Sequence, residues 1–238
     1  MPASVTFQQS AVPRGLNRGE IHIWHARLEL LAGMAQGLLL TLSPDEQRRA
    51  EKFRFEKDRN RYAMSRGILR DLLGRYLGIS PGSVQFHYGA HGKPYLSEKS
   101  SPYPIHFSLS HSCGLVLFGF SLDQKIGIDV EHIRTDFDFE SIAKKYLSAS
   151  EFAKLLALAP AARSAEFFRW WTRIEAYAKA RGIGISLLDD QGMSSPVGEM
   201  SNWKLEEFTP EVDYVASVAS TLSTSILKHW KYSHLRET

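Results

Sequence analysis

The chain has 238 residues, of which 43% are hydrophobic and 23% are charged, as in a globular protein with one large domain or two small ones. No apolar run reaches the ~20 residues of a membrane span, and residues 1–15 lack the basic-then-apolar layout of a signal peptide. The single cysteine, Cys113, excludes an internal disulfide, and a net charge of +3 does not demand nucleic acid. We expect a cytoplasmic protein without a membrane or nucleic-acid partner, with Cys113 a small filler or, less favoured, a nucleophile.

The first half of the chain is predicted to begin with a strand and two helices. Residues 21–30 alternate between apolar and polar types, which is typical of a strand. Residues 43–46, Ser-Pro-Asp-Glu, form a capping box with proline at the first helical position, and a charged helix is expected to about Lys57. Apolar residues at helical spacing predict a second helix over 60–77, which Gly78 ends.

Short strands are predicted around the middle of the chain. A strand is expected at 84–88, a loop at 89–104, and then strands at 105–109, 114–122 and 126–131. The tight turn at 123–125 predicts that the last two of these strands pair as a hairpin.

The second half is predicted to be helical first and to end in strands. Ser148 and Glu151 form another capping box, followed by a helix to about Leu158. Pro160, set among alanines, indicates a linker, and the next helix is expected over 165–181. Residues 203–209 and 213–220 are predicted to be two more strands.

A weak internal repeat relates the two halves. The segment IHIWHA at residue 21 matches IGIDVE at residue 126, and Leu-Ser-x-x-Glu at residue 42 matches the same pattern at residue 147, both 105 residues later. Gly-Ile-Ser at residue 78 matches residues 184–186, 106 residues later. Either the strings agree by coincidence or an α+β unit is duplicated. In a duplication, Asp129 and Glu131 would correspond to Trp24 and Ala26, so one half alone would carry an acidic pair.

The acidic pair of the IGIDVE segment has two interpretations. Asp129 and Glu131 lie two residues apart on a predicted strand and so share one face, where like charges repel. A hard cation such as Mg²⁺, which prefers oxygen ligands, would relieve this repulsion. A solvated strand face is the simpler alternative.

The helix predicted at 165–181 carries a glutamate and a lysine on one face. Glu175 and Lys179 are four residues apart and follow Trp171 at the same spacing. Either they form a surface ion pair, or Glu175 is a third metal ligand and Lys179 faces a bound anion.

Two further segments could bind phosphate. Ser110 and His111 offer a hydroxyl and an imidazole where the predicted strand opens into a polar turn, although plain turn chemistry explains them too. Adjacent strand residues point to opposite faces, which argues against a Ser–His nucleophile pair. Gly92, Lys93 and Pro94 lie in the predicted loop. Either a stiffened turn holds the Lys93 cation for a ligand, or the three residues form a plain hairpin turn. Several arginines precede them as a basic wall or a solvated helix face: Arg48, Arg49, Arg54, Arg59, Arg61 and Arg66.

Together, G-K-P, F-S-L-S-H-S, I-G-I-D-V-E and W-T-x-x-E-A-x-x-K, in this order, resemble the 4′-phosphopantetheinyl transferases of the Sfp type over about residues 20–190. The resemblance implies an α+β pseudo-dimer of two similar halves, antiparallel sheet packed with helices, with the active site at the seam. We place the halves at 1–123, for the nucleotide of coenzyme A, and at 124–238, for the metal ligands and catalytic helix. An intrachain pseudo-dimer is expected to be a monomer.

The resemblance also implies a reaction and roles. The 4′-phosphopantetheine arm of coenzyme A passes to a serine of an apo acyl or peptidyl carrier protein, releasing adenosine 3′,5′-bisphosphate. Mg²⁺, or Mn²⁺ in its place, would be held by Asp129, Glu131 and Glu175. Glu151 matches a proposed base, although it also belongs to a capping box and a metal-bound water could serve instead. The coenzyme A contacts implied are Arg49, Arg61, Lys93, Pro94, Ser110, His111, Asp129 and Lys179.

Two departures from the family pattern bear on activity. Ile174 stands where members commonly have lysine, and Ser108 stands where many have asparagine. Ile174 points about 100° away from Glu175 on a helix, so it should not remove a metal ligand. It motivates the alternative of a binding module for coenzyme A or carrier protein that has lost turnover. A metal-dependent phosphatase has less support, because no acidic cluster for a second metal is present.

Overall fold

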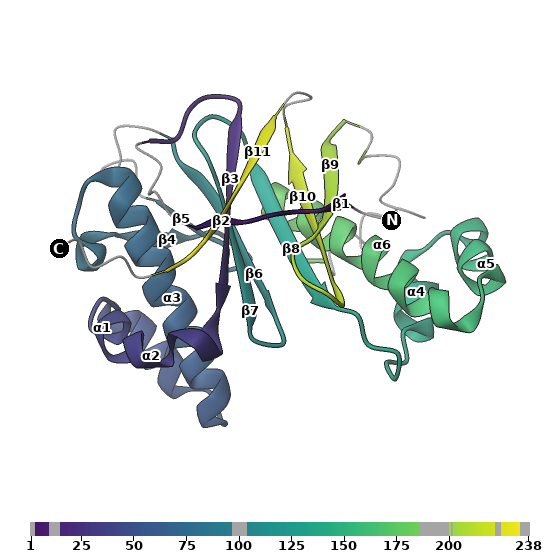
Figure 1. The fold of residues 1–238 in the computed structure, drawn as a ribbon, viewed down its shortest axis with the longest axis horizontal. Helices are drawn as coiled ribbons and strands as arrows, with labels where there is room; N and C mark the ends of the chain where they lie inside the picture. The colour runs from purple at the N-terminus through teal and green to yellow at the C-terminus, as the bar shows by residue number, and fades with distance from the viewer. Residues whose placement is uncertain are drawn as a thin grey trace.

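A computed structural model describes residues 3–9, 15–96, 104–185, 200, 202–221 and 225–233. Two larger sheets occupy the middle of the molecule, with α1–α3 on one side and α4–α6 on the other (Figure 1). The fold is the α+β pseudo-dimer expected from the sequence. None of the helices in the described ranges is long and apolar enough to cross a membrane.

The first half supplies a long helix and the central strands of a five-stranded sheet with the order β2-β11-β3-β7-β6. Its elements are β1 (Ala3–Ser4), β2 (Gln8–Gln9), β3 (Glu20–Arg27), the 3₁₀ helix η1 (Leu28–Met34), α1 (Ala35–Leu39), α2 (Pro44–Glu51), α3 (Glu56–Leu77), the 3₁₀ helix η2 (Pro81–Ser83), β4 (Phe86–Tyr88), β5 (Pro94–Leu96), β6 (His106–Ser112) and β7 (Leu115–Ser121).

The second half supplies the other long helix and most of a four-stranded sheet with the order β1-β9-β10-β8. Its elements are β8 (Ile126–His132), α4 (Glu140–Tyr146), α5 (Ala149–Ala157), α6 (Pro160–Arg181), β9 (Lys204–Thr209), β10 (Tyr214–Ser220) and β11 (Ile226–Lys231).

The duplication is visible in the topology. The order β3-β7-β6 of the first sheet recurs as β8-β10-β9 in the second, with antiparallel pairing in both. The long helices α3 and α6 each have 22 residues and end at a left-handed glycine, Gly78 and Gly182. Gly78 therefore corresponds to Gly182 and not to Gly184, and residue 186 of the expected match lies outside the described residues.

The two halves exchange their terminal strands. β1 pairs in parallel with β9 of the second sheet, whereas β11 pairs in parallel with β3 of the first (Figure 1). The sheets are therefore mixed and not purely antiparallel. A boundary at residue 123 does not separate the two sheets, because each sheet contains a strand from the other half. We keep this boundary as a proposal for the helices and the central strands only.

The alternating sequence of β3 and β8 explains how the layers pack. Ile21 and Ile23 on β3 meet Ile128 and Val130 on β8 in an apolar cluster between the halves. The other face of β3, including Trp24, packs with residues of α3 such as Leu69. Period-2 alternation thus gives each strand one face for the other half and one for its own helix.

Two predictions about connections were wrong. β7 and β8 do not pair, because both edges of β7 are already occupied by β3 and β6, and β8 pairs with β10 instead. Pro160 is not in a linker but is the first residue of α6, where its missing N–H costs nothing.

Other predictions about local structure also differ: the strand expected at 21–30 ends at Arg27, and the loop expected at 89–104 contains β5. The helix expected to reach Lys57 ends at Glu51, and α3 starts anew at Glu56. β6 continues through Ser112, so Ser110 and His111 lie within a strand and not at the opening of a turn. Cys113 is an exposed turn residue with φ of 45°, not a buried filler.

Candidate active site

The site begins where β8 crosses α6 at close range. Gly127 of β8 makes this approach feasible, because a Cβ there would lie 1.9 Å from the Ala176 carbonyl oxygen and 2.4 Å from the Ala180 nitrogen. The alternation of β8 puts Asp129 on the same face as Gly127, against the helix that carries Lys179. The glycine in IGIDVE therefore sets the distance between the predicted carboxylates and the predicted lysine.

Asp129 is at the centre of a buried polar cluster. Its side chain is 4% exposed, and its Oδ1 accepts hydrogen bonds from Lys179 Nζ at 2.6 Å and Ser110 Oγ at 2.7 Å. Lys179 Nζ also donates to Ser110 Oγ at 3.0 Å. Burial alone would lower the pKa of Lys179, but Asp129 and Glu175 raise it above its usual value. The cluster joins β6 of the first half to β8 and α6 of the second.

Glu131 lies two residues further along β8 and is linked to β6 in the same manner. Its Oε2 accepts a hydrogen bond from Ser112 Oγ at 2.8 Å. Desolvation, together with the negative charge of Asp129, raises the pKa of Glu131 to about 7. The predicted repulsion between these two carboxylates is therefore present.

Glu175 approaches the cluster from α6. Desolvation and the charge of Asp129 raise its pKa, while Lys179, four residues later on the same helix, opposes that shift. Asp129, Glu175 and Glu131 each favour the charged form of Lys179, so all three carboxylates lie near this amino group.

Lys93 reaches across the seam between the halves. Its Nζ donates to the carbonyl oxygens of Ile126 at 3.1 Å and Lys179 at 2.5 Å. Desolvation, and next the charge of Lys179, lowers the pKa of Lys93 to about 8. Lys93 and Pro94 line a pocket together with Lys179 and Gly182.

His111 marks a region of positive potential beside the cluster. Desolvation of its ring lowers its pKa, and the charges of Lys179 and Arg61 lower it further. Arg61, on α3, is therefore close enough to influence the charge of His111, and its Nη1 lies 4.0 Å from Asp58 Oδ1. Arg49 lies with its guanidinium carbon 5.9 Å from the centroid of the Tyr62 ring and is exposed.

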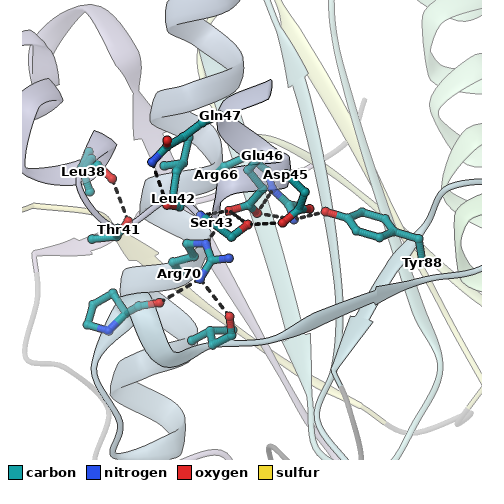
Figure 2. Close-up of polar contacts among 12 residues, drawn as sticks. Leu38, Thr41, Leu42, Ser43, Asp45, Glu46, Gln47, Arg66, Arg70 and Tyr88 are labelled. Atoms are coloured by element: carbon teal, nitrogen blue, oxygen red, sulfur yellow. Dashed lines mark hydrogen bonds and ion pairs between the residues drawn. The ribbon is translucent and has the colours of Figure 1, made fainter. Parts of the chain in front are cut away.

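Arg66 is not part of an exposed basic wall. It turns inward with Arg70, and both donate from Nε to Glu46, at 2.8 Å and 2.6 Å (Figure 2). All three residues are buried, and Arg66 also donates to Tyr88 Oη at 3.1 Å. Periodicity alone places Arg66 on α3 but cannot show that it faces a buried carboxylate.

Glu151 lies away from the cluster, at the start of α5. Its Oε2 accepts hydrogen bonds from Ser148 N at 2.9 Å and Ser148 Oγ at 2.5 Å, which completes the predicted capping box. It lines a different pocket, with Leu155, Phe167 and Trp170. The structure thus gives Glu151 a capping role and does not bring it into the hydrogen-bonded network of Asp129.

The first half has no counterpart of this cluster at the corresponding position. Trp24 takes the place of Asp129; it is buried, donates from Nε1 to Tyr76 Oη at 2.8 Å, and stacks on Trp230. Ala26, which takes the place of Glu131, is fully buried. The duplicated position is therefore apolar core, in agreement with a single site.

The residues of the cluster fit a hard divalent cation. Oδ2 of Asp129 is buried and has no hydrogen-bond partner among the described residues. The donors nearby are carboxylates and hydroxyls, which Mg²⁺ prefers, and a cation would relieve their repulsion. Within the described part of the chain, no three His, Cys, Asp or Glu side chains form a ready metal-binding group. The cation would thus need further oxygens from a substrate, as is common for Mg²⁺.

Two contributors to the site were not identified from sequence. Gly127 and Ser112 are ordinary strand residues in pattern, and only the packing of β8 on α6 and β6 gives them their contacts. The alternation of serines at 108, 110 and 112 was the available signal, since it places three hydroxyls on one face of β6.

Comparison with known proteins agrees with this arrangement. A family model described as the N-terminal part of 4′-phosphopantetheinyl transferase matches residues 33–119, and one for the 4′-phosphopantetheinyl transferase superfamily matches residues 125–236. The 4′-phosphopantetheinyl transferase HetI of Nostoc sp. is 38% identical over 219 residues, which cover 90% of this chain and 92% of HetI.

Two Bacillus proteins give partial matches. The 4′-phosphopantetheinyl transferase psf-1 of Bacillus pumilus is 32% identical over 67% of this chain and 64% of its own length. Sfp of Bacillus subtilis is 28% identical over 61% of this chain and 62% of its own. With two models that together span both halves and a relative matched over nearly its whole length, the chain belongs to the 4′-phosphopantetheinyl transferase superfamily.

Proposed function

We propose that the protein transfers the 4′-phosphopantetheine arm of coenzyme A to a serine of an apo acyl or peptidyl carrier protein, with Mg²⁺ or Mn²⁺ bound. The activity is that of a holo-[acyl-carrier-protein] synthase. The observation that carries the proposal is the cluster of Ser110, Asp129 and Lys179, contributed by both halves and held by hydrogen bonds of 2.6 to 3.0 Å. A cation-binding carboxylate beside a lysine suits a pyrophosphate substrate.

In the reaction, the serine oxygen of the carrier forms a bond to the phosphorus that bears the pantetheine arm. The bond from this phosphorus to the bridging oxygen of the pyrophosphate breaks, and adenosine 3′,5′-bisphosphate leaves. The metal, when bound by Asp129, Glu131 and Glu175, supplies charge neutralisation at the pyrophosphate. Lys179 offers a second positive charge to the same phosphates, which favours the charge that develops on the leaving group.

The nucleotide end of coenzyme A is proposed to lie along the first half. The positive potential around His111, to which Arg61 contributes, favours its phosphates, and Arg49 is proposed to extend this surface. Lys93 and Pro94 line the pocket beside Lys179 and are proposed to contact the substrate there. The serine proton requires an acceptor, for which Glu151 and a metal-bound water are the two proposals.

Loss of turnover receives little support from Ile174. Its side chain is fully buried with Tyr177 and Met200 in the apolar cluster that α6 forms. Ile174 is therefore a core residue that leaves Asp129 and Lys179 in contact, so we favour an active transferase over a binding module. Because one chain supplies both halves, we propose that it acts as a monomer.

Mass spectrometry tests the proposal directly. The protein is incubated with coenzyme A, Mg²⁺ and a panel of apo carrier proteins, and the carrier should gain the mass of one phosphopantetheine group while adenosine 3′,5′-bisphosphate appears in equal amount. Chelation of the metal should stop both. A panel of carriers without any mass gain would contradict the proposal, and coenzyme A binding without transfer would favour the binding module.

A further inference from the structure

The two sheets meet where β6 runs against β8, and side chains of the first half bind the edge of β8 that has no strand partner. Each of these strands is the last in its sheet, and they are not paired with one another through their main chains. Ser108 Oγ accepts the N–H of Ile128, and Ser112 Oγ accepts the N–H of His132, both at 3.1 Å. Hydroxyls thus replace part of the main-chain ladder that an adjacent strand would form.

Two of the three serines of this row also bind the carboxylates of β8. Ser110 Oγ donates to Asp129 at 2.7 Å, and Ser112 Oγ donates to Glu131 at 2.8 Å. Of these serines, Ser110 interacts with Lys179 as well, whereas Ser112 binds both the carboxylate of Glu131 and the main chain of the next residue.

The chemistry of a hydroxyl makes the Ser112 contact directional. A serine hydroxyl has one proton and two acceptor sites. The N–H of His132 occupies an acceptor site, and the proton goes to Oε2 of Glu131. This fixes the hydroxyl to the backbone of β8 and holds one carboxylate oxygen, which leaves Oε1 for another ligand.

We propose that Ser112 is a positioning residue that orients the Glu131 carboxylate toward the metal, and that it does so from the opposite half of the molecule. The inference rests on the proposed function, in which Glu131 is a metal ligand. Partners of metal ligands commonly change metal affinity by about 10- to 100-fold when they are removed. The half that is proposed to bind the nucleotide would thereby help to shape the metal site of the other half.

Mn²⁺ binding in the presence of saturating coenzyme A and without carrier protein, followed by the electron paramagnetic resonance signal of the free ion, tests this without turnover. Ser112→Ala should weaken Mn²⁺ binding about 10-fold. Ser108→Ala is the matched control, because Ser108 lies on the same strand and bonds only to the main chain of Ile128 among these contacts. It should lower the melting temperature yet leave Mn²⁺ affinity within about 2-fold of the wild type.

A second pair of variants separates the hydroxyl from side-chain volume. Ser112→Thr keeps a hydroxyl and Ser112→Val replaces it by a methyl group of similar shape, so Thr should restore Mn²⁺ affinity and Val should not. In transfer assays, Ser112→Val should raise the Mg²⁺ concentration needed for half-maximal rate. The factor of this increase should exceed the factor by which the rate at saturating Mg²⁺ falls.

The outcomes distinguish this inference from the proposed function. A wild-type protein that binds no Mn²⁺ and modifies no carrier would overturn the function itself. A wild-type protein that does both, with Ser112→Val equal to Ser112→Thr in Mn²⁺ affinity, would overturn the positioning role of Ser112 and leave the function standing.

Discussion

The amino group of Lys179 lies 2.6 Å from Oδ1 of Asp129, and this ion pair joins α6 to β8. The carboxylate is 4% exposed, so removal of the lysine leaves a buried charge without its partner. We expect Lys179→Ala to lower the free energy of unfolding by about 3 kcal/mol without metal, measured by urea denaturation. Transfer to the carrier should fall by about 100-fold or more, because a charge that stabilises the leaving group is lost.

The double variant Asp129→Asn with Lys179→Met provides the control for this pair. It removes both charges, so it should recover much of the stability lost in Lys179→Ala while activity stays low. Equal instability of the single and double variants would contradict the assignment of the loss to an unpaired carboxylate.

Gly127 sets the spacing between β8 and α6, and Gly127→Ala should disturb it. The new Cβ would meet backbone atoms of Ala176 and Ala180, which cannot rotate away. We expect a loss of about 3 kcal/mol in unfolding free energy, with transfer activity reduced because Asp129 and Lys179 move apart. Gly37→Ala, in α1, is the matched control: a Cβ there has no atom within 4 Å, so stability should be unchanged or slightly raised.

The sequence predicted the repeated unit well because its signals are local. Alternation identified β3 and β8, and the capping boxes at Ser43 and Ser148 identified the starts of α2 and α5. Strand partners are not local: adjacency along the chain favoured a β7–β8 hairpin, whereas the edges of β7 are filled by strands from elsewhere. The exchange of β1 and β11 between the halves has no local signal either.

The site was predictable to the extent that its chemistry is carried by the motif. Asp129, Lys179 and Ser110 were all named from sequence and lie in one hydrogen-bonded cluster. Arg66 was grouped with exposed arginines, since a helix pattern does not say which charged residue meets a buried carboxylate from another helix. The dual contact of Ser112 was missed for the same reason, because it depends on how two sheet edges meet.

Glu46 tests whether Arg66 and Arg70 are structural. Both guanidinium groups depend on this carboxylate, and its replacement by alanine leaves two buried cations with fewer partners (Figure 2). We expect Glu46→Ala to lower the free energy of unfolding by about 3–5 kcal/mol, measured by urea denaturation. Arg48→Ala, an exposed change on the same helix, should stay within about 0.5 kcal/mol of the wild type. Similar stability for both variants would argue that the buried network contributes little.

The burial of His229 predicts that the protein loses stability as the pH falls. It lies on β11 with ring contacts to Phe7 and Phe208, and desolvation lowers its pKa from 6.5 to about 4. The unfolded chain therefore binds more protons than the native protein between these values, so stability is lost as the pH falls from about 6.5 to 4. His229→Phe should reduce the loss of unfolding free energy that occurs as the pH falls through this range. An unchanged pH profile would show that His229 titrates normally in the folded protein.

Substitutions of Glu151 distinguish a role as a helix cap from a role as the base for the acceptor serine. Its Oε2 is occupied by Ser148, and glutamine can accept the same hydrogen bonds without acting as a base. We expect Glu151→Gln to keep the transfer rate within about 3-fold of the wild type, and Glu151→Ala to lower the free energy of unfolding by about 1 kcal/mol through loss of the cap. Rates are measured at saturating coenzyme A and carrier, over a range of pH. A loss of 100-fold or more in Glu151→Gln, with normal stability, would instead identify Glu151 as the general base.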